Sequence, residues 1–260
     1  MIDVRALRSS RDVEEALGGL IGEVPARDAG VIHVTSVWES PSGALHTLRI
    51  GPATPKSAHD LFLLQSTRAR ADAILVTGKV LRDEPLLVYA LEGPGSSGPA
   101  LRAYRRECLG RDEPPWLLVL TARADLDPAH PALSGWARPV VLTSPESAAR
   151  LTGRLDPSID IVALAPLGVR EAIAHARVAR GARTVSLEAG PSTTAPLHAP
   201  PEVVDELVLG IFRGPAPPRE VLGGELPPLA RLEERFPLRS VPRRVEEESG
   251  PWEFRRLRRL

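Results

Sequence analysis

Short apolar segments with strand-like composition recur through the first 190 residues, and helical patterns lie between several of them. Strands that alternate with helices are typical of an α/β domain whose central strands run parallel. The predicted strands are residues 30–38, 73–77, 116–120, 139–142, 159–164 and 184–188, and the predicted helices are residues 57–71 and 169–180. We therefore expect a mixed, mostly parallel central sheet flanked by helices.

The C-terminal part of the sequence has a different pattern. Three further strands are predicted at residues 206–212, 238–245 and 252–257, with no helix predicted between them. Strands joined without a helix pair in antiparallel fashion, so we expect antiparallel strands here. Stretches rich in Gly, Pro and Ser predict loops at residues 39–55, 92–114 and 214–228. The arginine-rich residues 255–259 are expected to form a solvated terminus.

The first 28 residues are expected to form an N-terminal extension with one short helix. Ser10 is a suitable N-cap, acidic residues follow in the first turn, and Gly18 and Gly19 are expected to end the helix. Residues 29–260 are expected to form a single domain, because a boundary within residues 92–114 would leave strands unpaired on both sides.

Charge and composition exclude several classes of function. The 33 basic residues balance the 33 acidic residues, so no overall positive field attracts nucleic acid or an anionic membrane. No apolar run approaches the roughly 20 residues that span a bilayer. Cys108 is the only cysteine and no signal segment is apparent, which predicts a soluble, cytoplasmic protein. The six histidines lack metal-binding spacing, so no metal site is expected.

One candidate site follows the strand predicted at residues 184–188. Glu188 ends this strand, at the position where open α/β sheets bind their ligands, and the sequence continues as Ala-Gly-Pro-Ser-Thr-Thr. A glycine turn that leads into hydroxyl residues at a helix start can present backbone N–H groups to a phosphate. The same residues also fit a plain tight turn in which Ser192 caps the helix.

A second candidate site follows the strand predicted at residues 73–77, where the sequence continues Gly-Lys-Val-Leu-Arg-Asp-Glu. Lys79 is suited to bind a phosphate, and Asp83 is suited to bind a ribose hydroxyl or to handle a proton. The alternative is a surface turn in which these charged residues are solvated.

Together these motifs resemble the reductase domain of bacterial riboflavin-biosynthesis deaminase-reductases, a family with a dihydrofolate-reductase-like fold. The segments that carry the resemblance are, in order, SPSGA at 40–44, TRA at 67–69, DAILV at 72–76, VLRDEPLL at 80–87, LEAGP at 187–191 and VDEL at 204–207. The resemblance spans about residues 30–258 and does not include the zinc-binding deaminase half of that family.

The resemblance implies an NADPH-dependent reductase that delivers hydride to the sugar C1 of a small-molecule substrate, 5-amino-6-(5-phosphoribosylamino)uracil. It implies that Arg68, Leu87 and Glu188 bind the substrate. Asp83 is the candidate catalytic residue, which handles the proton of the leaving ring oxygen or orients the donor of that proton. The implied cofactor-binding residues are Thr54, Lys79, Asp83, Gly190, Pro191, Ser192, Thr193 and Thr194. A homodimer is also implied, with the strand at residues 252–254 either at the interface or covered by its own chain.

Several family site residues are replaced in this sequence. Ala44 stands where the family has a lysine, Thr54 where it has a tryptophan, and Ala90 where it has an arginine that meets the substrate phosphate. A charged hydrogen bond contributes about 1.5–3 kcal/mol, so the loss of two cations weakens the binding of a phosphorylated substrate. Two alternatives follow. One is a reductase of the same fold for another small heterocycle or carbonyl, and the other is a non-catalytic nucleotide-binding homologue.

Overall fold

The computed structural model describes residues 3–22 and 30–259, so residues 1–2 and 23–28 of the expected N-terminal extension lie outside it. The chain divides into two compact units. Unit 1 consists of Met1–Arg70, Leu91–Arg111 and Gly190–Leu260, and unit 2 consists of Ala71–Ala90 and Asp112–Ala189.

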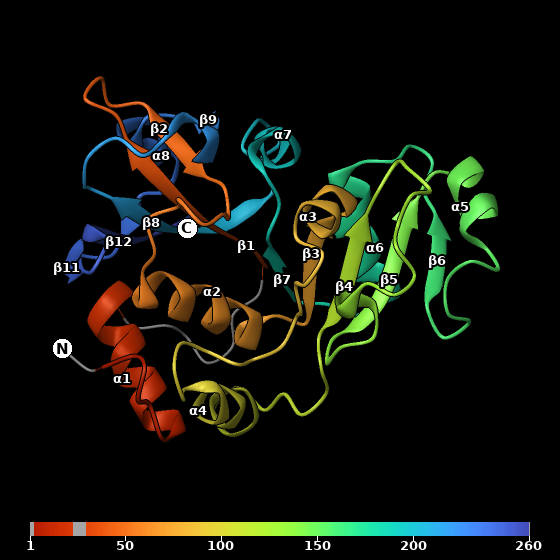
Figure 1. The fold of residues 1–260 in the computed structure, drawn as a ribbon, viewed down its shortest axis with the longest axis horizontal. Helices are drawn as coiled ribbons and strands as arrows, with labels where there is room; N and C mark the ends of the chain where they lie inside the picture. The colour runs from red at the N-terminus through yellow and green to blue at the C-terminus, as the bar shows by residue number, and fades with distance from the viewer. Residues whose placement is uncertain (1–2, 23–29, 260) are drawn as a thin grey trace. The chain divides into compact units, whose positions relative to one another are not determined.

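Unit 2 is built on a parallel sheet with the strand order β7-β3-β4-β5-β6 (Figure 1). The strands are β3 (Ala73–Thr77), β4 (Trp116–Leu120), β5 (Arg138–Thr143), β6 (Asp160–Ala163) and β7 (Thr184–Leu187), and the helices are α3 (Gly78–Asp83), α5 (Pro145–Leu151) and α6 (Val169–Ala179). Apolar side chains of β3, β4 and β5 are buried, which explains why these strands were recognisable as continuous apolar runs.

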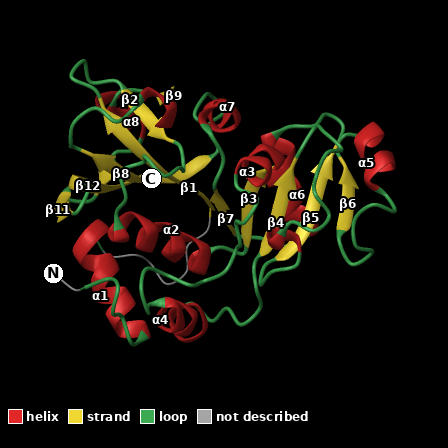
Figure 2. Cartoon of the chain, viewed as in Figure 1, coloured by secondary structure: helices red, strands yellow, loops and turns green. Residues whose placement is uncertain are grey.

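Unit 1 contains the antiparallel strands. Its strands are β1 (Gly30–Glu39), β2 (Leu45–Leu48), β8 (Val204–Phe212), β9 (Leu222–Leu226), β10 (Leu238–Arg239), β11 (Arg243–Glu247) and β12 (Gly250–Arg258). β1 and β8 run parallel, whereas β12 runs antiparallel to β8 and also pairs with β10 and β11. The helices are α1 (Ser10–Ile21), α2 (Ala58–Arg70), α4 (Gly98–Ala103), α7 (Pro191–Thr194) and α8 (Leu229–Arg235), shown in red in Figure 2.

These elements confirm the expected fold class, a mixed and mostly parallel sheet with helices and antiparallel C-terminal strands. β12 lies between β8 on one side and β10 and β11 on the other. The strand at residues 252–254 is therefore covered by its own chain and is not an edge strand.

Two helical regions differ from the sequence predictions. Ser9, not Ser10, caps α1, and the helix continues through Gly18 and Gly19. Each helical glycine costs about 1 kcal/mol, but Leu20 and Ile21 beyond them are buried, which favours the longer helix. Residues 92–114 are not a simple exposed loop: α4 and a π-helix (Tyr104–Cys108) fill much of this segment and pack against α1. A proline in the first turn of α4 is compatible with a helix because no N–H is needed there.

The predicted loops at residues 39–55 and 214–228 also contain structure. β2 and β9 lie within them and pair with each other, and β2 also pairs with β1. The predicted strand at residues 238–245 is two strands, β10 and β11, separated at Pro242, which has no N–H for a ladder. The arginine-rich residues 255–259 are not a solvated terminus, because most of them belong to β12 and form ion pairs.

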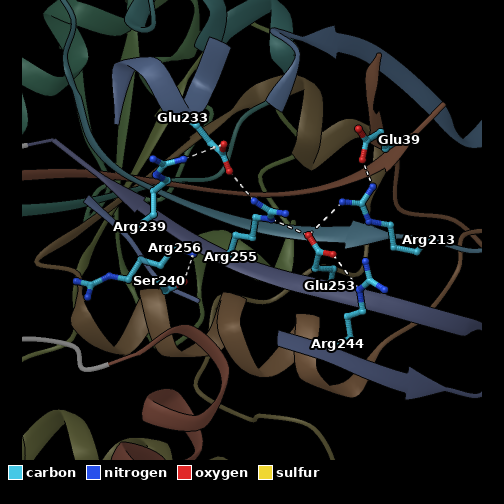
Figure 3. Close-up of polar contacts among 9 residues, drawn as sticks. All are labelled: Glu39, Arg213, Glu233, Arg239, Ser240, Arg244, Glu253, Arg255 and Arg256. Carbon is cyan, nitrogen blue, oxygen red and sulfur yellow. Dashed lines mark hydrogen bonds and ion pairs between the residues drawn. The ribbon is translucent and has the colours of Figure 1, made fainter. Parts of the chain in front are cut away.

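A network of ion pairs stabilises the C-terminal strands of unit 1 (Figure 3). Glu253 of β12 is buried and accepts hydrogen bonds from Arg213 at 3.1 Å, Arg244 at 3.2 Å and Arg255 at 2.6 Å. Arg255 also binds Glu233 of α8 at 2.6 Å. Burial alone raises the pKa of Glu253, but the arginines lower it overall. The network therefore ties β12 to the end of β8, to β11 and to α8.

Candidate functional site

The carboxyl ends of β7, β3 and β4 meet at one edge of the unit 2 sheet. The register pairs Leu75 with Leu187 and Thr77 with Leu120, so the residues that follow each strand emerge side by side. This edge is where open parallel sheets bind ligands. It brings Glu188 and the segment that contains Lys79 and Asp83 to the same side of unit 2.

Glu188 is held by the neighbouring strand. Its backbone N–H donates to the carbonyl of Leu75 in β3 at 2.9 Å. Its side chain accepts a hydrogen bond from the hydroxyl of Ser186 at 3.4 Å, and Ser186 itself is buried. The backbone bond therefore places Glu188 at the end of β7, while the contact of its carboxylate with Ser186 is long for a hydrogen bond.

Lys79 and Asp83 form an ion pair on α3. The helix begins after Thr77, whose hydroxyl accepts a hydrogen bond from the N–H of Val80. Lys79 and Asp83 are four residues apart and face each other on one side of this helix. Their side chains are 72% and 57% exposed, so both groups are accessible to a ligand, and Asp83 competes for Lys79 with any phosphate.

Close packing at the start of α3 requires glycine. A Cβ on Gly78 would lie 2.7 Å from the hydroxyl oxygen of Thr121, the residue that follows β4. The same edge carries an ion-pair cluster, in which Arg82 and Arg123 bind the carboxylate of Asp125 at 2.9 and 2.7 Å. Arg123 and Asp125 are not among the predicted site residues, although they follow a predicted strand just as Glu188 and Lys79 do.

Leu87 lies in the segment after α3. Its N–H donates to the carbonyl of Glu84 at 3.0 Å, and its side chain packs against the apolar core of unit 2. The preceding Leu86 is 85% exposed. An exposed apolar side chain, Leu86, therefore follows the charged residues of α3 in the sequence.

Gly190–Thr194 follow Glu188 directly and belong to unit 1. They form the predicted helix start, α7, in which the N–H groups of Thr193 and Thr194 both donate to the carbonyl of Gly190. Pro191 lies against Gly224 of β9, where a Cβ would come within 3.2 Å of the proline ring. The hydroxyl oxygen of Thr194 is buried and has no hydrogen-bond partner among the described residues. Ser192 is exposed and Thr193 is partly exposed, so these two hydroxyl residues are the ones of α7 open to a polar group such as a phosphate.

Arg68 and Thr54, the other predicted site residues in unit 1, are in separate places. Arg68 is buried in the last turn of α2. Two residues later Arg70 binds Glu206 near the start of β8, which places the end of α2 toward the amino ends of β1 and β8. The hydroxyl of Thr54 donates to the carbonyl of Arg49 in the loop before α2. Their binding roles stay predictions.

Neither a metal centre nor a membrane span occurs among the described residues. Residues 3–22 and 30–259 contain no group of three or more His, Cys, Asp or Glu side chains arranged to hold a metal ion. In the same ranges no helix is long and apolar enough to cross a bilayer.

No family model matches this sequence, and no curated protein sequence is significantly similar to it. Solved structures do share its fold. A pyrimidine reductase-like protein from Corynebacterium diphtheriae superposes with a TM-score of 0.65 at 21% identity, over 94% of this chain and 99% of that one. The riboflavin biosynthesis reductase Rib7 of Saccharomyces cerevisiae gives a TM-score of 0.50 at 12% identity, over 95% and 100% of the two chains.

A third solved structure with this fold belongs to a longer protein. The diaminohydroxyphosphoribosylaminopyrimidine deaminase/5-amino-6-(5-phosphoribosylamino)uracil reductase of Thermotoga maritima gives a TM-score of 0.51 at 18% identity. The match covers 89% of this chain but only 57% of that protein. The chain therefore has the fold of riboflavin-biosynthesis pyrimidine reductases. The resemblance inferred from sequence motifs is confirmed at the level of the fold.

Proposed function

We propose that this chain is an NADPH-dependent reductase that acts on 5-amino-6-(5-phosphoribosylamino)uracil or a close relative of it. The observation that carries the proposal is the placement of Glu188 and the Lys79–Asp83 pair at one carboxyl edge of the parallel sheet. This arrangement occurs in a fold shared with structures described as pyrimidine and riboflavin biosynthesis reductases.

Each proposed role follows from the chemistry of the residue. The hydroxyl groups of Ser192 and Thr193 bind the cofactor phosphates as hydrogen-bond donors, whereas a contact with the buried Thr194 is implied by the family resemblance alone. Glu188 accepts hydrogen bonds from the substrate, since its backbone is held at the carboxyl end of β7 by the bond to Leu75. Bound NADPH would supply the hydride. Other proposed contacts, with Arg68, Leu87, Thr54, Gly190 and Pro191, are those implied by the family resemblance.

Asp83 is the proposed proton-handling group. Its carboxylate is exposed beside Lys79, where it can act as a base or orient a water. A cofactor or substrate phosphate that draws Lys79 away would weaken this pair.

A variant that lacks one hydroxyl of α7 tests whether this segment binds NADPH. Thr193→Val removes the hydroxyl and keeps nearly the same side-chain volume. It should weaken NADPH binding by roughly ten- to hundredfold, because one hydrogen bond to a charged phosphate is lost. Calorimetric or fluorescence titration with NADPH measures the dissociation constant. The matched control is Thr152→Val, because Thr152 bonds to the carbonyl of Ala148 on α5 of unit 2. The control should bind as the unchanged protein does.

The outcome of the titration separates the proposed functions. NADPH binding followed by loss of NADPH on addition of the phosphoribosylamino-pyrimidine supports the proposal. Absence of NADPH binding by the unchanged protein contradicts it. Binding without turnover of any substrate indicates a non-catalytic nucleotide-binding homologue.

Ala44, which stands where the resembled family has a lysine, supports a second candidate function. Ala44 lies in the turn between β1 and β2, where its N–H and carbonyl both bond to Ser40, and it offers no cation. A reductase of the same fold for an unphosphorylated heterocycle or carbonyl would not need that cation. Turnover of the phosphoribosylamino-pyrimidine at ordinary enzyme rates would exclude this candidate.

A further inference from the structure

His130 is a buried imidazole that the proposed mechanism does not use. It follows β4 in unit 2 and is only 4% exposed. Its Nε2 atom lies 3.0 Å from the carbonyl oxygen of Leu81 and 3.1 Å from that of Glu84. Its Nδ1 atom lies 3.1 Å from the backbone nitrogen of Ala132. Leu81 and His130 are 49 residues apart in the sequence, so one side chain joins two distant segments of unit 2.

The three backbone partners fix the role of each ring nitrogen. A carbonyl oxygen only accepts, so Nε2 carries the hydrogen and donates it to Leu81 and Glu84. An amide N–H only donates, so Nδ1 accepts from Ala132. Both nitrogens are therefore engaged, and the ring is buried. His130 is suited to hold the backbone and not to exchange a proton with a substrate.

The donor nitrogen of His130 holds the last turn of α3, which ends at Asp83. The last carbonyls of a helix lack partners within the helix. His130 donates to the carbonyl of Leu81 and to that of Glu84, the residue that caps the helix. The Glu84 carbonyl also accepts from the N–H of Leu87 at 3.0 Å. One imidazole therefore supports the turn that carries Asp83, the proposed proton-handling group, and Leu87, a predicted substrate contact.

The backbone of His130 is itself held by hydrogen bonds. Its N–H donates to the carbonyl of Asp127 at 3.1 Å, and its carbonyl accepts from the N–H of Leu133 at 2.9 Å. Leu133 and Leu81 are buried in the same apolar cluster. The end of α3 is therefore fastened to an ordered part of the unit 2 core, whereas the side chain of Asp83 is 57% exposed.

We propose that His130 is a positioning residue for Asp83. The hydrogen bonds from Nε2 fix the backbone on both sides of Asp83, and with it the point from which an exposed carboxylate extends. Misplacement of a reacting group by about 1 Å can cost roughly a hundredfold in rate. The effect on catalysis rests on the proposed function, whereas the hold on the turn does not. The proposed cofactor segment at residues 190–194 belongs to unit 1, so NADPH binding should not depend on His130.

Two substitutions separate the two nitrogens of His130. His130→Asn keeps an acceptor for the N–H of Ala132, as asparagine does at helix N-caps, but is too short to reach the two carbonyls at the end of α3. His130→Gln places an amide N–H about where Nε2 lies and can donate to these carbonyls.

The two variants should differ in kcat for NADPH oxidation with the phosphoribosylamino-pyrimidine. H130N should lower kcat roughly tenfold or more and leave the dissociation constant of NADPH unchanged, and H130Q should recover most of the loss. His175→Asn is the matched control, because His175 is partly exposed on α6 of the same unit, and it should leave kcat unchanged.

Amide hydrogen exchange of the ligand-free protein tests the hold on the turn without any substrate. In H130N the N–H groups of Glu84 and Leu87 should exchange roughly tenfold faster, because the hydrogen bonds that order the turn are lost. Unchanged exchange in α6 shows that unit 2 is folded. H130Q should exchange nearly as the unchanged protein does. His130→Ser, which also keeps a short acceptor, is a second variant that should behave as H130N does.

Two results would overturn the proposal. One is unchanged exchange at Glu84 and Leu87 in H130N and His130→Ser. The other is an equal loss of kcat in H130N and H130Q, which is the outcome expected of a purely structural role. If the unchanged protein oxidises no NADPH, the proposed function is contradicted instead, and the exchange measurement still decides whether His130 holds the turn.

Discussion

Glu206→Gln is expected to lower the free energy of unfolding by about 3–5 kcal/mol, the usual cost of breaking a buried ion pair from one side. Glu206 lies on β8 with a side chain only 5% exposed. Arg70 of α2 binds both of its oxygens, at 2.8 and 3.0 Å, and Arg256 of β12 binds one of them at 2.7 Å. Glutamine removes the negative charge and leaves two buried guanidinium groups without it.

Because Glu206 can be protonated, we expect the free energy of unfolding to depend on pH. Burial alone raises the pKa of Glu206, but Arg70 and Arg256 lower it from 4.5 to about 2. A depressed pKa in the folded state contributes stability above pH 4.5, and this contribution is lost as the pH falls toward 2. The shift corresponds to about 3 kcal/mol. The unchanged protein should lose this stability in acid, whereas Glu206→Gln should not.

Urea unfolding at several pH values measures both effects. Glu202→Gln is the matched control, because Glu202 pairs with Arg259 at 3.2 Å and is 34% exposed. Partly exposed pairs contribute about 1 kcal/mol or less. A loss in Glu206→Gln no larger than in this control would show that the buried arginines are solvated or have other partners. Adding Arg70→Met and Arg256→Met to the Glu206→Gln variant should recover part of the loss.

The sequence was sufficient to predict the strands whose burial produces a continuous apolar run. β3, β4 and β5 were found for this reason. β2 and β9 were missed because each is only four or five residues long and is flanked by glycine or proline. Short strands of this kind are stabilised by each other and by β1, and these are partners that no local pattern reveals.

The candidate site was predictable only where its residues follow a recognisable strand. Glu188 and Lys79 were found in this way. The buried ion pairs were not, since Arg70 and Glu206 are 136 residues apart in the sequence, and an arginine in a helix looks like a solvated residue until its partner is known. Arg256 likewise lies in a stretch whose composition predicts a solvated tail, although its side chain is buried against Glu206. The pairing of charges in this chain is a property of the tertiary structure.

Asp60→Asn is expected to raise the free energy of unfolding at neutral pH by up to about 3 kcal/mol. Burial raises the pKa of Asp60 from 3.8 to about 6, the hydroxyl of Ser36 lowers it in part, and the charge of Glu247 raises it further. The carboxylate accepts from Ser36 at 2.6 Å and packs against the backbone of Gly210 in β8, where a side chain would collide with it. Its ionised form is therefore costly in the folded state.

The sign of this effect is opposite to that of Glu206. Below pH 3.8 Asp60 is protonated in both the folded and the unfolded chain and has no effect. As the pH rises from 3.8 to 6, the unfolded chain ionises first, so the folded state loses stability, and the loss persists at higher pH. Asparagine keeps an oxygen that can accept from Ser36 and cannot ionise. The stability difference between Asp60→Asn and the unchanged protein should therefore vanish in acid.

Chemical unfolding between pH 3.5 and 8 tests this prediction, with Asp160→Asn as the control because Asp160 is 58% exposed. The control should change stability by less than about 1 kcal/mol at every pH, as expected for an exposed ion pair. A destabilised Asp60→Asn at neutral pH would mean that the ionised carboxylate is bound favourably in the folded state. Together with the acid behaviour of Glu206, the two variants separate a carboxylate that two arginines stabilise from one that burial opposes. Both carboxylates are in unit 1, so the same unfolding transition reports on each.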